Sequence, residues 1–167
     1  MDISFRLAKN ADLQLILSMM RQFYAIDDYE FDEPGAHAAL KMLVEDSSLG
    51  RVWVIYTATE IVGYIALTFG YSLEYRGRDA WIDELFLLEA YRGQGLGTKT
   101  LAFVLEQCHP LNIQALHLEV EQTNAAGQAL YRKMGFASHE QRQFMTRLSG
   151  QSPSLSPTSP TPAGNAG

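Results

Sequence analysis

Residues 83–98 read DELFLLEAYRGQGLGT, an apolar run that leads into a glycine-rich turn. The run is long enough for a β-strand, and a helical pattern begins near Thr98. The first N–H groups of a helix have no partner within it, and the aligned peptide dipoles place partial positive charge there. The glycines of the turn let this backbone approach an anion closely, and Arg92 adds a permanent cation. We therefore expect a strand, a turn and a helix whose N-terminus binds a pyrophosphate.

Two common phosphate-binding motifs do not fit this turn. A dinucleotide fingerprint of the form G-x-G-x-x-G requires glycine at position 98 or 100, and both positions hold threonine. A P-loop requires lysine directly after its last glycine, and Thr98 stands there instead. These spacings disfavour a nucleotide-binding α/β protein.

Length and composition indicate one domain. The chain has 167 residues, 47% of them apolar, which is enough for a sizeable core. We expect the folded domain over residues 1–148, and a disordered tail over residues 149–167, where Ser, Pro, Thr, Gly and Ala dominate. There is no run of about 18 uncharged apolar residues and no basic-then-apolar leader. We therefore expect no membrane span and a cytoplasmic location.

The charge of the chain narrows the class of partner. The net charge is −6 and the isoelectric point is near 5.1. A nucleic-acid surface would be basic, so we expect no nucleic-acid partner, whereas an acidic surface attracts cationic amines. Cys108 is the single cysteine, which excludes an internal disulfide and a thiolate metal cluster, and we expect no metal site.

Hydrophobic periodicity predicts the order of the elements. The expected strands are Ile3–Leu7, Arg51–Thr57, Ile61–Tyr71, Asp79–Leu88, Ala115–Val120 and closing strands from Phe136, one of them near Phe144–Leu148. The expected helices include Leu13–Tyr24, one from Pro34, one from near Thr98 to before Pro110, and one after Asn124. The fold class is thus α/β (α+β), with a mixed, mostly antiparallel sheet of six to seven strands flanked by about four helices.

The connection between the first two helices is the most acidic part of the chain. Residues 25–33 read AIDDYEFDE, with acids interleaved between large apolar side chains. One interpretation is a solvated loop that caps the next helix. The other is a wall of an amine-binding site, in which Asp27 and Asp28 contact the substrate. Glu119 is a third candidate of this kind, because strand alternation places it either in a cleft or in solvent.

Two motifs resemble one known family. Arg92, Gly95 and Gly97 match the R-x-x-G-x-G motif of the GNAT family of N-acetyltransferases, on the same strand-to-helix turn. Asn124 and Tyr131, followed by RKMGF at residues 132–136, resemble the family's N-x(6)-Y-x-K/R-x-G-F segment. The order of the elements over residues 1–148 is also similar. The resemblance implies the acyl-CoA N-acyltransferase fold and acetyl-CoA as co-substrate.

The resemblance also implies roles for individual residues. The main chain of Leu85, Phe86 and Leu87 would contact the pantetheine arm, and Asn124 would contact the cofactor arm. Tyr131 would be the general acid that protonates the departing CoA sulfur. The pyrophosphate would be bound by Arg92, Gly93, Gln94, Gly95, Leu96, Gly97 and Thr98.

The reaction also needs a deprotonated amine. An amine with a pKa near 10.4 requires roughly 4–5 kcal/mol for deprotonation at pH 7. Asp83 and Glu84 occupy the strand position where the family commonly places its base. Alternation puts them on opposite faces, so without a bulge only one reaches the cleft, and the sequence leaves open which.

These observations favour direct acetyl transfer from acetyl-CoA to a primary amine in a ternary complex. The acid-rich connection favours a small cationic acceptor, such as a polyamine or an amino-acid derivative. Two alternatives stay open: a protein N-terminus or lysine as acceptor, and a non-catalytic module that senses acyl-CoA. Homodimers formed by sheet-edge pairing are common in the family, but no residue pattern shows one here.

Overall fold

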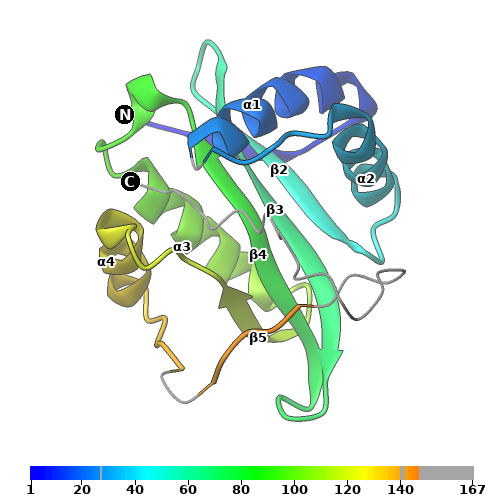
Figure 1. Ribbon diagram of the computed structural model, residues 1–167, viewed down its shortest axis with the longest axis vertical. Coiled ribbons are helices and arrows are strands. Elements are labelled where there is room, and N and C mark those ends of the chain that lie inside the picture. The colour runs from blue at the N-terminus through cyan, green and yellow to red at the C-terminus, as the bar shows by residue number, and fades with distance from the viewer. Residues whose placement is uncertain (27, 140–141, 147–167) are drawn as a thin grey trace.

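The computed structural model describes residues 1–26, 28–139 and 142–146, which form one sheet with helices on both faces (Figure 1). The strands are β1 (Ser4–Leu7), β2 (Gly50–Tyr56), β3 (Ile61–Ser72), β4 (Gly77–Leu87) and β5 (Ile113–Leu118). The α-helices are α1 (Leu13–Ile26), α2 (Glu33–Glu45), α3 (Leu96–Cys108) and α4 (Ala125–Lys133), and two short 3-10 helices are η1 (Asn10–Asp12) and η2 (Glu89–Tyr91). None of the helices in these ranges has the length and apolar character needed to cross a membrane.

The sheet has the strand order β1-β2-β3-β4-β5. The first three pairings are antiparallel and the last, between β4 and β5, is parallel. A parallel pair needs a crossover connection, which α3 provides. The predicted mixed, mostly antiparallel sheet is confirmed.

The predicted number of strands is too high for the part of the chain that the structure describes. The sheet has five strands, because residues 136–139 and 142–146 form no ladder with β5. Between Phe136 and Phe144 no large apolar side chain supplies the alternation of a half-buried strand. Residues 147 and 148 of the expected last strand, and the predicted boundary between domain and tail, lie outside the described residues.

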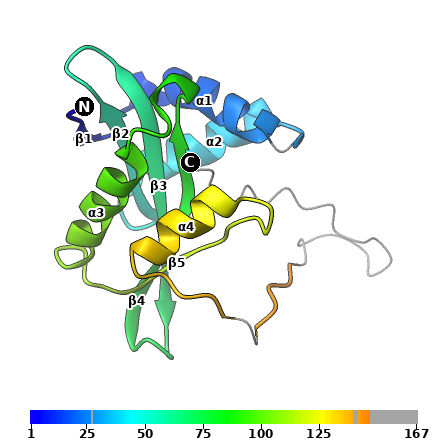
Figure 2. The same ribbon diagram turned by 90° about the vertical axis from the view of Figure 1, so that its left-hand side faces the viewer.

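Two apolar layers enclose the sheet, and Figure 2 shows the helix pairs that cover them. α1 and α2 pack on one face, where Phe23, Tyr64 and Phe86 are buried. α3 and α4 pack on the other face, with side chains that include Leu85 and Leu87. β4 is therefore a central strand, covered on both faces.

A β-bulge interrupts the pairing of β3 with β4. Ala66 lies opposite Glu84, and the next residue, Leu67, lies opposite Ile82. Asp83 is therefore an extra residue on β4, without a partner in the ladder. Because of this insertion, Ile82 and Leu85 pack in the same apolar layer although they are three positions apart.

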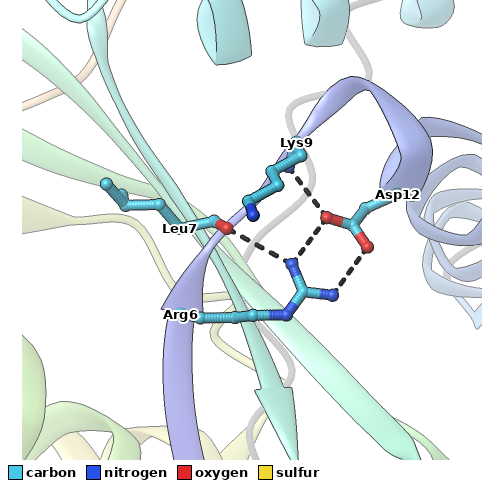
Figure 3. Close-up of polar contacts among 4 residues, drawn as sticks. All are labelled: Arg6, Leu7, Lys9 and Asp12. Atoms are coloured by element: carbon cyan, nitrogen blue, oxygen red, sulfur yellow. Dashed lines mark hydrogen bonds and ion pairs between the residues drawn. The ribbon is translucent and has the colours of Figure 1, made fainter.

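The start of α1 is fixed to β1 by a buried carboxylate (Figure 3). The guanidinium of Arg6 donates to both carboxylate oxygens of Asp12, at 2.7 and 2.8 Å. The backbone N–H of Lys9 donates to Asp12 Oδ2 at 2.8 Å, and Arg6 also donates to the carbonyl of Leu7 at 3.3 Å. These bonds hold the turn of η1 between the strand and the helix.

Candidate active site

The glycine-rich turn follows β4 through η2 and ends at the first residue of α3. Gly93 and Gly95 have φ angles of +69° and +77°, a region that favours glycine. Gly95 is the N-cap of α3, so the helix begins at Leu96, two residues before the predicted start. A Cβ at Gly93 or Gly95 would meet no atom within 4 Å, so the space beside the turn is open. The turn therefore fits a ligand that approaches the backbone.

A pocket of about 180 Å³ lies between this turn and α4. Its lining residues are Leu87, Gly93, Gly95, Leu96, Gly97, Thr98, Ala126 and Leu130. Six of these were predicted to bind the cofactor, and the structure brings them together at the N-terminus of α3, where unpaired amides favour an anion. The side chains of Leu85 and Phe86 are buried in the two core layers, so only their main chain remains for a ligand.

Arg92 and Gln94 stabilise the turn through their side chains. Arg92 Nε donates to the carbonyl of Leu87 at 2.9 Å, and its guanidinium lies 5.3 Å from the centre of the Phe86 ring. Gln94 Nε2 donates to the carbonyl of Ala90 at 2.8 Å. These bonds hold the turn against the end of β4, and a contact of either side chain with pyrophosphate stays a prediction.

The two residues of the second motif lie at opposite ends of α4. Asn124 is its N-cap, and the side-chain oxygen accepts from the N–H of Gly127 at 2.8 Å. Tyr131 is 3% exposed, and its ring packs edge-on to Phe136 with centroids 5.9 Å apart. Burial raises the pKa of Tyr131 to about 12, which keeps the hydroxyl protonated at neutral pH. Tyr131 therefore has the protonation state of a proton donor.

The two adjacent acids of β4 have different environments. Glu84 is 5% exposed, and the hydroxyl of Tyr64 donates to its Oε2 at 2.7 Å. Desolvation raises the pKa of Glu84 to about 7; the hydrogen bond from Tyr64 and the influence of Tyr24 oppose this rise, and the charge of Asp83 adds to it. Asp83 is solvent-accessible at the bulge, yet the protein around it raises its pKa by desolvation. Because of the bulge, the side chains of β4 do not alternate regularly between the two faces at Asp83 and Glu84, so alternation cannot decide which acid reaches the cleft.

Further acids lie within electrostatic reach of this pair. Desolvation raises the pKa of Glu119, and the charges of Asp83 and Glu121 raise it further. Glu121 Oε1 in turn accepts from the hydroxyl of Tyr29, at 3.3 Å. We call Asp83, Glu84, Glu119 and Glu121 the acidic cluster.

The acid-rich connection reaches the acidic cluster through Tyr29. Asp28 is exposed in this connection with a φ of +55°, and Asp27 lies outside the described residues. Glu119 follows the end of β5 and belongs to the acidic cluster, and its contact with a substrate stays a prediction. His117, on β5, does not belong to the acidic cluster: its Nε2 lies 3.4 Å from Asp79 Oδ2, and its ring contacts the Trp81 ring.

Sequence reasoning missed Tyr24, Tyr64 and Glu121. Tyr24 lies on the apolar face of the first predicted helix, and Tyr64 lies within an apolar strand, so from the sequence both look like core residues. Only the register of β3 and β4, with Ala66 opposite Glu84, shows that Tyr64 can reach the carboxylate. Glu121 lies beyond the end of β5 and carried no motif.

Comparisons with known proteins agree with this geometry. The sequence model described as "Acetyltransferase (GNAT) family" matches residues 16–136. The chain is 32% identical over 75 residues to the thialysine N-epsilon-acetyltransferases of Bos taurus and Mus musculus. That alignment covers 45% of this chain and 44% of each relative, so it spans less than half of their length.

Solved structures are similar over most of the chain. An integron cassette protein from the mobile metagenome of Cole Harbour Salt Marsh superposes with a TM-score of 0.77 at 31% identity, covering 89% of this chain and 91% of the other. A possible acetyltransferase from Clostridium difficile 630 has a TM-score of 0.77 at 22% identity, with 87% and 97% covered, and supports the fold alone. With the matched family model and the open turn at the start of α3, the chain belongs to the acetyltransferase (GNAT) family.

Proposed function

We propose that the protein transfers the acetyl group of acetyl-CoA to a small cationic primary amine, such as a polyamine or an amino-acid derivative. The observation that carries the proposal is the acidic cluster at the bulge of β4, on the strand that leads into the glycine turn. Because none of the perturbing groups of Glu84, Asp83 or Glu119 within the described ranges is a cation, the cluster favours a positively charged guest. The name of the bovine relative, which specifies an amine acceptor, supports the same class.

Acetyl-CoA supplies the acyl group, and the pocket between the glycine turn and α4 is where its pyrophosphate would bind. Within this proposal, Glu84 accepts a proton from the ammonium group, so that the amine nitrogen can attack the acetyl carbonyl carbon. As the carbon–sulfur bond breaks, the hydroxyl of Tyr131 donates its proton to the sulfur. The nitrogen loses its second proton to solvent, from which Tyr131 is reprotonated, so the products are a neutral amide and the CoA thiol. Asp83 contributes negative charge next to the ammonium ion.

The environment of Glu84 suits a base for this proton. Its pKa of about 7, against an ordinary value of 4.5, brings it closer to that of an alkylamine. At 1.36 kcal/mol per pH unit, this makes proton transfer from the amine easier by roughly 3 kcal/mol. A general base is most effective when its pKa lies near the working pH.

The test is a panel of acceptors assayed for CoA release, with the acetylated product identified by mass spectrometry. Diamines, lysine and thialysine represent cationic acceptors, and amines that also carry net negative charge serve as controls. We expect acceptor-dependent release with the cationic group only. Higher kcat/KM with anionic or neutral acceptors would refute the cationic acceptor.

The alternatives predict other outcomes of the same assay. Faster acetylation of peptide N-termini or peptidyl lysines than of any small amine would indicate a protein acceptor. Acetyl-CoA binding without release for any acceptor would indicate an acyl-CoA sensor. The cytoplasmic location and the disorder of residues 149–167 stay predictions from the sequence, and no residue pattern in it indicates the homodimer that is common in the family.

A further inference from the structure

The carboxylate of Glu84 lies between tyrosines from two different elements. Tyr64, on β3, is 1% exposed and donates to Glu84 Oε2 at 2.7 Å. Tyr24, in the second half of α1, also acts on Glu84 and favours its charged form. The titratable groups that act on Glu84 are these two phenols and Asp83 of β4.

The hydroxyls of both tyrosines can donate hydrogen bonds at neutral pH. Desolvation raises the pKa of Tyr24 and of Tyr64 above the ordinary value, so both hydroxyls are protonated at neutral pH. A phenol has one O–H to donate, whereas an ionised carboxylate has about four acceptor positions. The hydroxyl of Tyr64 therefore occupies one acceptor position of the carboxylate and leaves others for an amine or a water. Burial of the charged form would otherwise be costly.

Tyr24 also connects this arrangement to the acid-rich connection. The N–H of Tyr29 donates to the carbonyl of Tyr24 at 3.0 Å, and the Phe31 ring packs edge-on to Tyr24 with centroids 5.3 Å apart. The hydroxyl of Tyr29 reaches Glu121 in the acidic cluster. The same segment that borders the acidic cluster thus packs against Tyr24, which acts on Glu84.

We propose that Tyr64 and Tyr24 are positioning residues, which orient the carboxylate of Glu84 and keep it ionised for removal of the acceptor's proton. The inference rests on the proposed function, because it assigns the base. It goes beyond that function by naming the groups that hold the base. Neither tyrosine needs to touch the reacting atoms for this role.

The experiment compares Tyr64→Phe, Tyr24→Phe and the control Tyr71→Phe in the full chain. Tyr71 is 77% exposed near the end of β3, so its hydroxyl has no part in the arrangement. The first readout is a carbon-13 NMR titration of the glutamate carboxyl groups without any substrate, with the Glu84 signal assigned by its loss in Glu84→Gln. The second is the pH dependence of kcat and KM with a cationic amine.

Loss of the Tyr64 hydroxyl removes a hydrogen bond that favours the charged form of Glu84, and loss of the Tyr24 hydroxyl removes a weaker influence of the same sign. We expect Tyr64→Phe to raise the pKa of Glu84 by about one pH unit, and Tyr24→Phe to raise it by less. The acidic limb of the kcat profile should move to higher pH with it. For Tyr64→Phe, kcat at pH 7 should fall roughly fivefold, because the ionised fraction of Glu84 falls from about one half to about one tenth, while KM changes less than about twofold because the acceptor contacts are unaltered.

An unchanged Glu84 titration in both variants, relative to wild type and Tyr71→Phe, would overturn the inference. Thermal unfolding monitored by circular dichroism checks the fold, and if Tyr64→Phe does not fold, the partly exposed Tyr24→Phe decides the question. The titration needs no turnover. Failure of acetyl transfer to every amine would therefore refute the proposed function, while the NMR result still decides the role of the tyrosines.

Discussion

At the scale of single residues, the bulge at Asp83 gives two adjacent acids different chemistry. Glu84 is enclosed by phenols and apolar side chains, and its pKa is raised to about 7. Asp83 has access to solvent and acts on Glu84, Glu119 and Tyr24 through its charge. Under the proposed function Glu84 is the base, and Asp83 attracts the cationic acceptor.

Glu84→Gln should remove the proton acceptor while preserving side-chain volume. We expect kcat at pH 7 to fall by about 10² or more, and the Kd of acetyl-CoA to stay within about twofold. Wild-type kcat should rise with pH through about 7, as Glu84 ionises, and the variant should lack this limb. Steady-state kinetics and calorimetry measure the two quantities, with Glu106→Gln on the exposed face of α3 as control. An equal loss in both variants would contradict the assignment.

Tyr131→Phe should remove the proton donor without opening the core, since the ring is kept. The leaving thiol has a pKa near 8.5 and needs less help than the amine. We therefore expect kcat to fall by about 10-fold, less than for Glu84→Gln, with acetyl-CoA affinity retained. Steady-state assays of CoA release measure the effect. If the variant has the same kcat as the wild type, Tyr131 is not the proton donor and its ring contributes only to packing.

At the scale of elements, the glycine turn combines a strained backbone with an open space. A comparison of two glycines with positive φ distinguishes the effect of backbone strain from the effect of the open space. Gly95, with a φ of +77°, lines the pocket between the glycine turn and α4, whereas Gly135, with a φ of +92°, follows α4 and does not line that pocket. A Cβ at either position would meet no atom within 4 Å. Alanine at each position therefore adds similar backbone strain, but only one adds a methyl group next to the pocket.

Gly95→Ala and Gly135→Ala should each lower the free energy of unfolding by about 1 kcal/mol, because the left-handed region disfavours a Cβ. Only Gly95→Ala should weaken acetyl-CoA binding, by roughly 10-fold, since its methyl group enters the space proposed for the pyrophosphate. Urea unfolding and calorimetry provide the comparison. Equal loss of affinity in both variants would show that strain, and not the pocket, is responsible.

The elements and the turn were predictable because their signals are local. Periodicity and turn residues located the helices and the strands up to β5, and the glycine spacing located the turn before α3. The start of α3 was missed by two residues, because Gly95 caps the helix with a backbone conformation that composition does not reveal. The strands expected after Phe136 are absent from the described residues. Phe136 and Phe144 are aromatic, but the residues between them lack the apolar alternation of a paired strand.

At the scale of the whole molecule, the acidic cluster shows what sequence could not supply. Its members come from positions 83, 84, 119 and 121, and the tyrosines that act on them come from positions 24, 29 and 64. Only the sheet register and the packing of α1 bring these residues together. The bulge that decides how Asp83 and Glu84 point is a property of the β3–β4 pairing. No pattern within β4 alone contains that information.

The stability of the whole fold should depend on pH through the joint between β1 and η1. The hydrogen bonds from Arg6 hold the pKa of Asp12 below its usual 3.8, and only 9% of the Asp12 side chain is exposed. A group whose pKa is lowered by folding stabilises the native state above its ordinary pKa, and this contribution is lost as pH falls through the lower, folded value. The joint is therefore intact at neutral pH and lost in strong acid.

Asp12→Asn keeps the shape of the side chain and removes its charge. We expect the variant to lose about 1–3 kcal/mol of unfolding free energy at pH 7, because hydrogen bonds to a charged group are the stronger ones. The difference from wild type should shrink as pH falls below 3.8, and it should vanish below the lowered pKa of the folded protein, where Asp12 of the wild type is also neutral. Urea unfolding at a series of pH values measures it, with Glu74→Gln as control, since Glu74 pairs with Arg142 on the exposed surface, where ion pairs contribute little. A difference that persists undiminished in acid would mean that the introduced amide disturbs packing, and that the charge of Asp12 is not what joins β1 to the first helix.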